Sequence, residues 1–317
     1  MNDKFFNSKY PILEAAMNRG ADVNLALACW EAGIFPSLVV PLNHPDNMEE
    51  YYSDIDSQLT EFKKSTGTID LNVAIDITSF ADSTILKILS SHKVTHLEIY
   101  PQPVLCEYFW YAKDKPTFNA MVNSGRKFLE KSIGPLKIIK RTKVVNVCEF
   151  GFGYTLKGSD AAGVTSSTYT TAEMFKLQKD LTPDAIIIPY GGVGTPKQVA
   201  DYISAGATAV GVGTLLAASV ESNLSMDTKL ALVGAKTENL VKLPDTGQQS
   251  LLFEAEGQIL NKKQNKHDWN REQSLEQGLR GNAHEGHIYA GTAVDYITEI
   301  RPVKEIVEYL VSELQIK

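Results

Sequence analysis

Short apolar runs alternate with helical patterns along the first two thirds of the chain. The helical patterns repeat their apolar positions three or four residues apart, as Ile85, Leu86 and Leu89 do. This alternation is typical of a parallel sheet wrapped by helices. Eight strands are predicted, at residues 11–15, 34–40, 69–75, 95–100, 136–141, 154–158, 185–190 and 208–212. Their number and regular spacing favour an α/β fold of the closed (β/α)8 type, the TIM barrel, over an open doubly wound sheet.

Capping signals mark the ends of the predicted helices. Thr170 with Glu173 has the spacing of a capping box, in which each side chain accepts a hydrogen bond from the other residue's backbone N–H. Thr195 with Gln198 repeats that spacing, and Gly206 is expected to stop the helix that follows. These two helices would flank the seventh strand, as a barrel requires.

The alternation of strands and helices stops after residue 214. A more polar segment follows and is predicted to form a mainly helical second domain inserted in the barrel. A final helix then returns to the barrel with an apolar stripe of Val303, Ile306, Val307 and Leu310. The predicted division is therefore a barrel at 1–215, the insertion at 216–287 and a returning segment at 288–317.

Two successive strands end in glycines, in the segments 186–194 and 209–214. Backbone N–H groups free of side chains at neighbouring strand ends can hold a phosphate, and the last two strands of a barrel often do so. The predicted phosphate residues are Gly191, Gly192, Gly213 and Thr214. The alternative is a pair of glycine-rich turns that bind nothing.

A third glycine-containing strand end, at 157–163, carries two charged residues, Lys157 and Asp160. Small residues there would let a flat ligand approach the backbone, and charged groups at this rim of a barrel are candidates for catalysis. The alternative is a surface turn in which Asp160 caps a helix.

Composition and charge narrow the class of partner. The formal net charge of −7 and the pI near 5.5 argue against nucleic acid or an anionic membrane as the main partner, so a small-molecule substrate is expected. The first residues do not resemble a signal peptide, and the protein is expected to be cytoplasmic, with a homodimer left open as its assembly. The histidines at 284 and 287 supply too few ligands for a metal site, so none is predicted.

Several motifs in a fixed order resemble the nitronate monooxygenase family. They lie at residues 10–17, 70–73, 157–163, 190–192 and 212–214, and a late segment at 275–294 agrees too. The resemblance implies an FMN-dependent barrel, related to the flavin enoyl-ACP reductases.

The resemblance also assigns roles to residues of this chain. Ala16 and Met17 would pass close to the flavin, and Asn72 would hydrogen-bond its isoalloxazine or ribityl part. Lys157 would lie near the ring and stabilise negative charge on the reduced flavin. The FMN phosphate would be held by Gly163, Gly191, Gly192, Gly213 and Thr214.

The chain departs from the family pattern on the substrate side. Relatives usually carry a catalytic histidine where this chain has Val164, and an alanine where it has Tyr190. The residue before Met17 is Ala16 instead of the usual proline. Tyr190 is the favoured replacement for the polar group, with residues 166–168 as other candidates. The aromatic cluster at 108–111 is expected to line the substrate cavity or to cover helices.

The sequence thus predicts an FMN-dependent oxidoreductase that passes electrons from a small nitronate-like anion to oxygen. Its candidate catalytic residues are Tyr190, Lys157 and Asp160. Three alternatives stay open: an NAD(P)H-dependent reductase of the enoyl-ACP type, a catalytically degenerate flavin-binding subunit, and a phosphate-binding isomerase without flavin.

Overall fold

The computed structural model describes most of the chain as parallel strands surrounded by helices. The described residues are 5–17, 20–40, 47–100, 115–142, 145, 153–163, 165, 168–243, 249–252, 271–280 and 286–314. All eight predicted strands are present. They are β1 (Ile12–Glu14), β2 (Ser37–Val39), β3 (Asn72–Asp76), β4 (His96–Tyr100), β5 (Lys137–Thr142), β6 (Gly153–Leu156), β7 (Ile186–Pro189) and β8 (Val210–Val212).

The eight strands form two parallel groups. One has the order β2-β3-β4-β5-β6-β7, and the other pairs β1 with β8. Single parallel bridges join the groups on both sides, from Leu13 to Phe35 and from Tyr190 to Gly211. The first is reinforced where the Glu14 N–H donates to the Phe35 carbonyl at 2.9 Å. The chain therefore has the parallel α/β architecture that the apolar pattern predicts.

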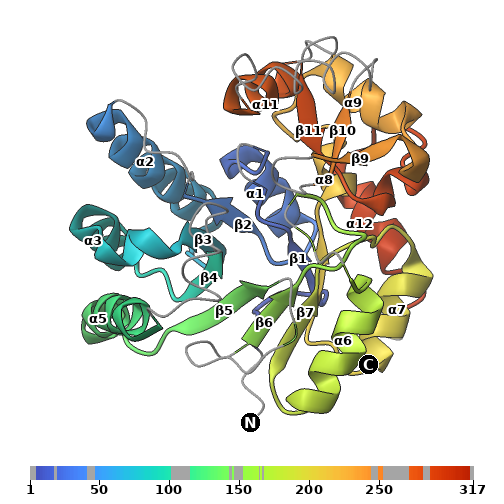
Figure 1. The fold of residues 1–317 in the computed structure, drawn as a ribbon. Coiled ribbons are helices and arrows are strands. Elements are labelled where there is room, and N and C mark those ends of the chain that lie inside the picture. The colour runs from blue at the N-terminus through green and yellow to red at the C-terminus, as the bar shows by residue number, and fades with distance from the viewer. Residues whose placement is uncertain are drawn as a thin grey trace.

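Helices cover the outside of the strands, and Figure 1 shows α2, α3 and α5 along one side of them and α6 and α7 along another. The bounds are α1 (Val23–Glu31), α2 (Met48–Thr66), the 3-10 helix η1 (Ile77–Ala81), α3 (Ser83–His92), α5 (Lys115–Ile133), α6 (Thr171–Leu181) and α7 (Pro196–Ser204). Both predicted capping boxes are confirmed, at Thr170 with Glu173 and at Thr195 with Gln198. Gly206, just beyond α7, adopts a φ of 89°, which an L side chain rarely tolerates.

The segment after β8 contains a small antiparallel sheet that the sequence pattern did not predict. The described elements of this segment are α8 (Thr214–Ala217), α9 (Met226–Gly234), η2 (Thr237–Asn239), β9 (Leu240–Lys242), β10 (Gln249–Leu252), α11 (Arg271–Leu279), β11 (His287–Tyr289) and η3 (Thr292–Tyr296). β10 pairs antiparallel with both β9 and β11. Figure 1 shows this sheet with α9 and α11 as one group at the top. The group touches the loop after β6, because Gly163 and Gln249 exchange backbone hydrogen bonds of 2.9 Å.

Apolar side chains pack on both faces of the strands. Outside, the predicted stripe on α12 (Val303–Leu310) is buried against the strands and helices, with Val303 and Leu310 fully enclosed. Inside, Phe6, Phe35 and Ile188 belong to a cluster that fills the space between strands. Strands covered on both faces read as continuous apolar runs, which explains why the sequence pattern located them. Among the described helices, none combines the length and apolar character needed to cross a membrane.

Candidate active site at the carboxyl ends of the strands

A buried glutamate organises the polar interior of the strand assembly. Glu98, in the middle of β4, has no exposed surface. Its Oε1 accepts hydrogen bonds from Arg141 Nε at 2.7 Å and from Thr155 Oγ1 at 2.8 Å. Its Oε2 accepts from Asn72 Nδ2 at 3.2 Å and, more weakly, from the Tyr190 hydroxyl at 3.4 Å. One carboxylate therefore ties together side chains from strands β3 to β6 and from the end of β7.

Arg141, on β5, links this cluster to the end of β1. Its Nη2 donates to the Ala16 carbonyl at 3.2 Å. Its guanidinium lies 5.4 Å from the ring centroid of Tyr100 and 5.9 Å from that of Tyr190, within the range of cation–π attraction. Arg141 thus fixes the backbone at one of the positions that the resemblance assigns to the flavin.

Lys157 follows β6 directly, and its charge has no partner among the described residues. Its N–H continues the ladder by donating to the Thr142 carbonyl at 2.9 Å, so its side chain shares the inward face of Thr155. The side chain is partly buried, and in the described part of the chain nothing accepts a hydrogen bond from its Nζ. A Cβ placed on Gly163 would lie 3.7 Å from that Nζ. None of the described groups therefore competes with an anionic or acidic ligand for this ammonium.

The surroundings of Lys157 disfavour its charged form. Burial is the largest cause and the positive charge of Arg141 the second, while Glu98 acts in the opposite direction. Together they lower the pKa of Lys157 to about 7. Among the described residues, Glu98 is engaged by Arg141 and only partly offsets the charge of Lys157, so an added anion would be stabilised.

Asn72 lies in the same buried layer with an unused acceptor. The residue has no exposed surface, and its Nδ2 also donates to Ser37 Oγ at 3.2 Å. Its Oδ1 is buried and has no hydrogen-bond partner within the described ranges. An unsatisfied buried carbonyl is costly, so this oxygen is an available acceptor for a donor from a ligand.

Tyr190 points into the strand assembly. Its side chain is buried, its hydroxyl meets Glu98, and burial raises its pKa well above the ordinary value, which keeps the phenol neutral. The ring packs closely on the backbone of β8, where a Cβ on Gly211 would lie 1.8 Å from Tyr190 Cδ1. Gly211 therefore makes room for the Tyr190 ring, and the effects of substitutions at these two positions are expected to depend on each other.

Gly211→Ala is expected to lower the free energy of unfolding by about 1–3 kcal/mol, because the new methyl group overlaps the Tyr190 ring. Urea denaturation of the variant and the parent measures this loss. The double variant Gly211→Ala with Tyr190→Ala removes the overlap, so its alanine at 211 should cost much less than in the Tyr190 background. Equal costs in the two backgrounds would contradict the packing described for this pair.

Asp160 lies in the turn between β6 and α6 and acts as a cap. Its Oδ1 accepts hydrogen bonds from the N–H of Thr171 at 2.8 Å and from its hydroxyl at 2.6 Å. Its backbone carbonyl accepts from the Thr292 N–H at 3.0 Å. This geometry matches the alternative interpretation of a capping aspartate, which orders the loop beside Lys157.

The paired glycines after β7 allow this strand end to pack against the same turn. Their φ angles are 154° at Gly191 and 65° at Gly192. A Cβ on Gly191 would lie 2.4 Å from Thr171 Oγ1, and one on Gly192 would lie 2.8 Å from Asp160 Oδ2. Close packing therefore requires both glycines, independently of any phosphate.

The other predicted phosphate residues differ in whether their backbone N–H groups are already hydrogen-bonded within the protein. Gly213 lies beside the end of β1, since a Cβ there would be 3.6 Å from Met17 Sδ, and Thr214 Oγ1 accepts from the Gly291 N–H at 3.2 Å. Gly163, in contrast, already donates its N–H to the Gln249 carbonyl. The amide of Gly163 is thus engaged by β10, which argues against its predicted contact with a phosphate.

Several candidates from the sequence lie outside the described residues. They are Val164, residues 166 and 167, the aromatic cluster at 108–111, and residues 284 and 285. Within the described ranges, no group of three or more His, Cys, Asp or Glu side chains is arranged to hold a metal ion. The absence of a metal from the mechanism stays a prediction.

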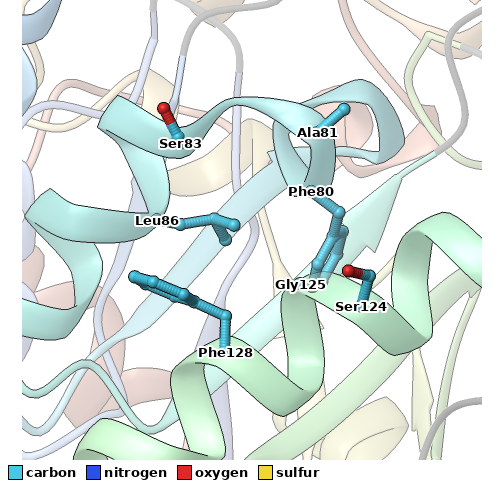
Figure 2. Close-up of a pocket in the computed structure, with 7 residues that line it drawn as sticks. All are labelled: Phe80, Ala81, Ser83, Leu86, Ser124, Gly125 and Phe128. Carbon is cyan, nitrogen blue, oxygen red and sulfur yellow. The ribbon is translucent and has the colours of Figure 1, made fainter.

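A groove on the outer helices is separate from this site. Figure 2 shows it between η1 with α3 on one side and α5 on the other, with the rings of Phe80 and Phe128 facing it. Its volume is about 330 Å³. The described residues that line it include no charged residue and none of the residues predicted for catalysis or cofactor binding; they are Phe80, Ala81, Ser83, Leu86, Ser124, Gly125 and Phe128.

The sequence reasoning missed Glu98 and Arg141, which hold the site together. A signal was present in the sequence, because Glu98 interrupts the apolar run between Leu97 and Ile99. A charged residue inside a strand that is covered on both faces has to be paired with an opposite charge. A neighbouring strand is the place where such a partner is expected.

Comparison with known proteins agrees with the geometry. The model of the nitronate monooxygenase family matches residues 153–313, just over half of the chain. No curated protein matches the sequence.

Solved structures of similar fold span almost the whole chain. FabK from Thermotoga maritima, solved as a mutant, is 20% identical with a TM-score of 0.74, and the match covers 98% of this chain and 94% of FabK. Nitroalkane oxidase from Streptomyces ansochromogenes is 16% identical with a TM-score of 0.69, covering 97% and 96%. The enoyl reductase domain of MlnA from Bacillus amyloliquefaciens is 15% identical with a TM-score of 0.68, covering 97% and 94%. From the family match over residues 153–313, the chain belongs to the nitronate monooxygenase family of flavin-dependent oxidoreductases.

Proposed function

We propose that this protein uses FMN to oxidise a small nitronate-like organic anion, with oxygen as the electron acceptor. The single observation that carries the proposal is the Lys157 ammonium at the carboxyl ends of the strands, beside Arg141 and unpaired within the described residues. Because Arg141 engages the carboxylate of Glu98, the charge of Lys157 is left for an anion. Both a nitronate and a reduced flavin carry such a negative charge.

The residues present fit a flavin at this end of the strands. Asn72, the first residue of β3, lies deeper between the strands than the residues at their carboxyl ends. Its Oδ1 is a buried acceptor without a partner among the described residues and would take a hydrogen bond from an isoalloxazine or ribityl part that reaches it. Ala16 and Met17 at the end of β1 would border the ring, and Gly213 with Thr214 at the end of β8 would hold the phosphate. When bound, the flavin supplies the electron-transfer chemistry that no side chain offers.

The chain's own groups then bind and orient the substrate. Lys157 would face the anion directly. Arg141 would hold the Ala16 carbonyl and thereby fix the backbone after β1, which forms the floor of the site. Tyr190, hydrogen-bonded to Glu98, would support this floor from within, which is a positioning role. Asp160 would order the loop that carries the position of Val164, where relatives have their histidine.

Architecture and assembly complete the proposal. The bridges beside β1 and β8 support a closed eight-stranded barrel. We retain the division into a barrel at 1–215, an insertion at 216–287 and a returning segment at 288–317. A cytoplasmic protein without nucleic-acid or membrane partners remains the prediction, and a homodimer stays open as its assembly.

An absorption spectrum of the purified protein tests the cofactor. We expect the visible bands of oxidised flavin, and FMN should rebind after its removal. Asn72→Ala should weaken rebinding by about tenfold, since a buried hydrogen bond contributes about 1 kcal/mol or more. Asn239→Ala, in η2, serves as the control and should rebind FMN normally. Colourless protein that refuses FMN would support the isomerase alternative and refute the flavin proposal.

A further inference from the structure

We infer that Glu14 is a positioning residue for the cofactor site, because its buried carboxyl joins β1 to β2 where their backbone ladder ends. Through this join it fixes Ala16 and Asn72, two positions that would meet the flavin. The inference rests on the flavin of the proposed function and concerns a residue to which that function assigns no role.

The first reason is that the backbone ladder between β1 and β2 ends just before the site. The Phe35 N–H donates to the Ile12 carbonyl and the Glu14 N–H donates to the Phe35 carbonyl, each at 2.9 Å. These two bonds form the bridge between Leu13 and Phe35, and the described residues contain no further bridge between β1 and β2. The next donor on this side of β2 is the N–H of Ser37, because residues two apart in a strand face the same neighbour.

The second reason is that a side chain meets this next donor. The Ser37 N–H donates to Glu14 Oε2 at 2.9 Å, and the Ser37 hydroxyl donates to the Glu14 backbone carbonyl at 2.7 Å. Neither residue has any exposed surface. A buried N–H has to be paired, and the carboxyl of Glu14 provides the acceptor. The two residues therefore hold β1 and β2 together at the point where the bridge between their backbones stops.

The third reason is that Ser37 passes this join on to the polar interior. Ser37 Oγ accepts a hydrogen bond from Asn72 Nδ2 at 3.2 Å, and the same nitrogen donates to Glu98 Oε2. The orientation of the Asn72 amide, and with it the direction of the unsatisfied Oδ1, thus depends on where Ser37 lies.

The same network returns to β1 on its far side. It ends at Arg141, which donates to the Ala16 carbonyl at 3.2 Å. The Ala15 N–H donates to the Val212 carbonyl at 2.8 Å and so holds this end of β1 against β8. The hydrogen bonds therefore leave β1 at Glu14 and return to it two residues later, where the backbone would border the flavin.

The carboxyl of Glu14 is largely neutral at neutral pH and resembles an amide. Among the described residues no cation pairs with it; the Cys29 thiol lies beside it, and Asp22 adds a repulsive charge. Burial is the largest cause that raises its pKa, to about 8. Glutamine has a similar shape and offers the same acceptor oxygen, so Glu14→Gln is the conservative variant, while Glu14→Leu removes the acceptor.

Hydrogen exchange of the flavin-free protein, read by mass spectrometry, tests the join between the strands. We expect peptides that cover residues 12–17 and 35–40 to exchange at least about tenfold faster in Glu14→Leu, since a buried N–H without its acceptor opens more easily. Glu14→Gln should exchange as the wild-type protein does. Cys29→Ala is the matched control, because it removes a buried side chain beside Glu14 and keeps the hydrogen bonds of Ser37.

Titration of the same flavin-free proteins with FMN, followed by flavin fluorescence, tests the consequence for the site. Glu14→Leu should bind FMN at least about tenfold more weakly, and Glu14→Gln and Cys29→Ala should bind as the wild-type protein does. Ser37→Ala is a second variant that serves even if Glu14→Leu does not fold. It keeps the bond from the backbone N–H to Glu14 but cuts the connection to Asn72, and it should also weaken FMN binding.

The outcomes separate this inference from the proposed function. Unchanged exchange in Glu14→Leu, or full FMN affinity in both Glu14→Leu and Ser37→Ala, would overturn the inference and leave the proposed function in place. Equal losses in Glu14→Gln and Glu14→Leu would overturn it too, because glutamine keeps the acceptor. Wild-type protein that refuses FMN would refute both. FMN binding that depends on Glu14, without oxidation of ethylnitronate in air, would support the inference and refute the proposed function.

Discussion

Glu98→Gln is expected to lower the free energy of unfolding of the flavin-free protein by about 3–5 kcal/mol. The substitution keeps the shape of the side chain but removes the negative charge, and Arg141, whose side chain is only 18% exposed, is then left with no carboxylate. Removing one partner of a buried ion pair is costly because the remaining charge has lost its hydration without compensation. Urea denaturation at neutral pH measures the difference.

Two further variants make this prediction specific. Asp201→Asn breaks the exposed pair between Lys197 and Asp201 and should cost less than about 1 kcal/mol. The double variant Glu98→Leu with Arg141→Met removes both charges and should recover most of the stability lost in Glu98→Gln. If Glu98→Gln cost no more than Asp201→Asn, the buried cluster would not organise the site as described.

Lys157→Met is expected to stabilise the flavin-free protein at neutral pH, by at least about 1 kcal/mol, since each unit of pKa shift corresponds to about 1.4 kcal/mol. The folded-state pKa of about 7 lies below the ordinary value, so keeping this lysine charged destabilises the folded protein. Between the two values the unfolded chain binds more protons, and this lysine's contribution therefore makes stability rise with pH. The penalty is fully present below about pH 7 and disappears near pH 10.4.

Urea unfolding midpoints of the wild-type protein and Lys157→Met at about pH 6 and about pH 10 check the predicted direction of this pH dependence. The advantage of Lys157→Met should be largest at the lower pH and should shrink as the pH rises. If the difference in stability between Lys157→Met and the wild-type protein did not change with pH, the substitution would act by packing alone. If Lys157→Met were less stable than the wild-type protein at low pH, the unpaired ammonium would be contradicted.

The strands and their order were predictable from the sequence, while the contacts across them were not. The parallel strands are covered on both faces, and strands buried in this way consist mainly of consecutive apolar residues. The capping boxes at Thr170 and Thr195 were predictable for a similar reason, since their hydrogen bonds join residues three positions apart.

The interior cluster depends on contacts distant in the chain. Glu98 meets Arg141 from a position 43 residues away and Tyr190 from one 92 residues away, and no local pattern specifies such pairs. The strands β9 to β11 were missed because each has only three or four residues in a polar segment. Asp160 was predicted to be catalytic from its place in the loop, yet its hydrogen bonds to Thr171 could be seen only in the fold.

Anaerobic titration of the purified protein with ethylnitronate tests the central claim most directly. The account predicts that the nitronate bleaches the visible flavin absorption without any nicotinamide, and that admitting air restores it. It also predicts that bleaching becomes weaker in Lys157→Met, because the cation that faces the anion is gone. Flavin that stays oxidised with the nitronate but is bleached rapidly by NADH or NADPH would contradict the claim and assign the chain to the reductase alternative.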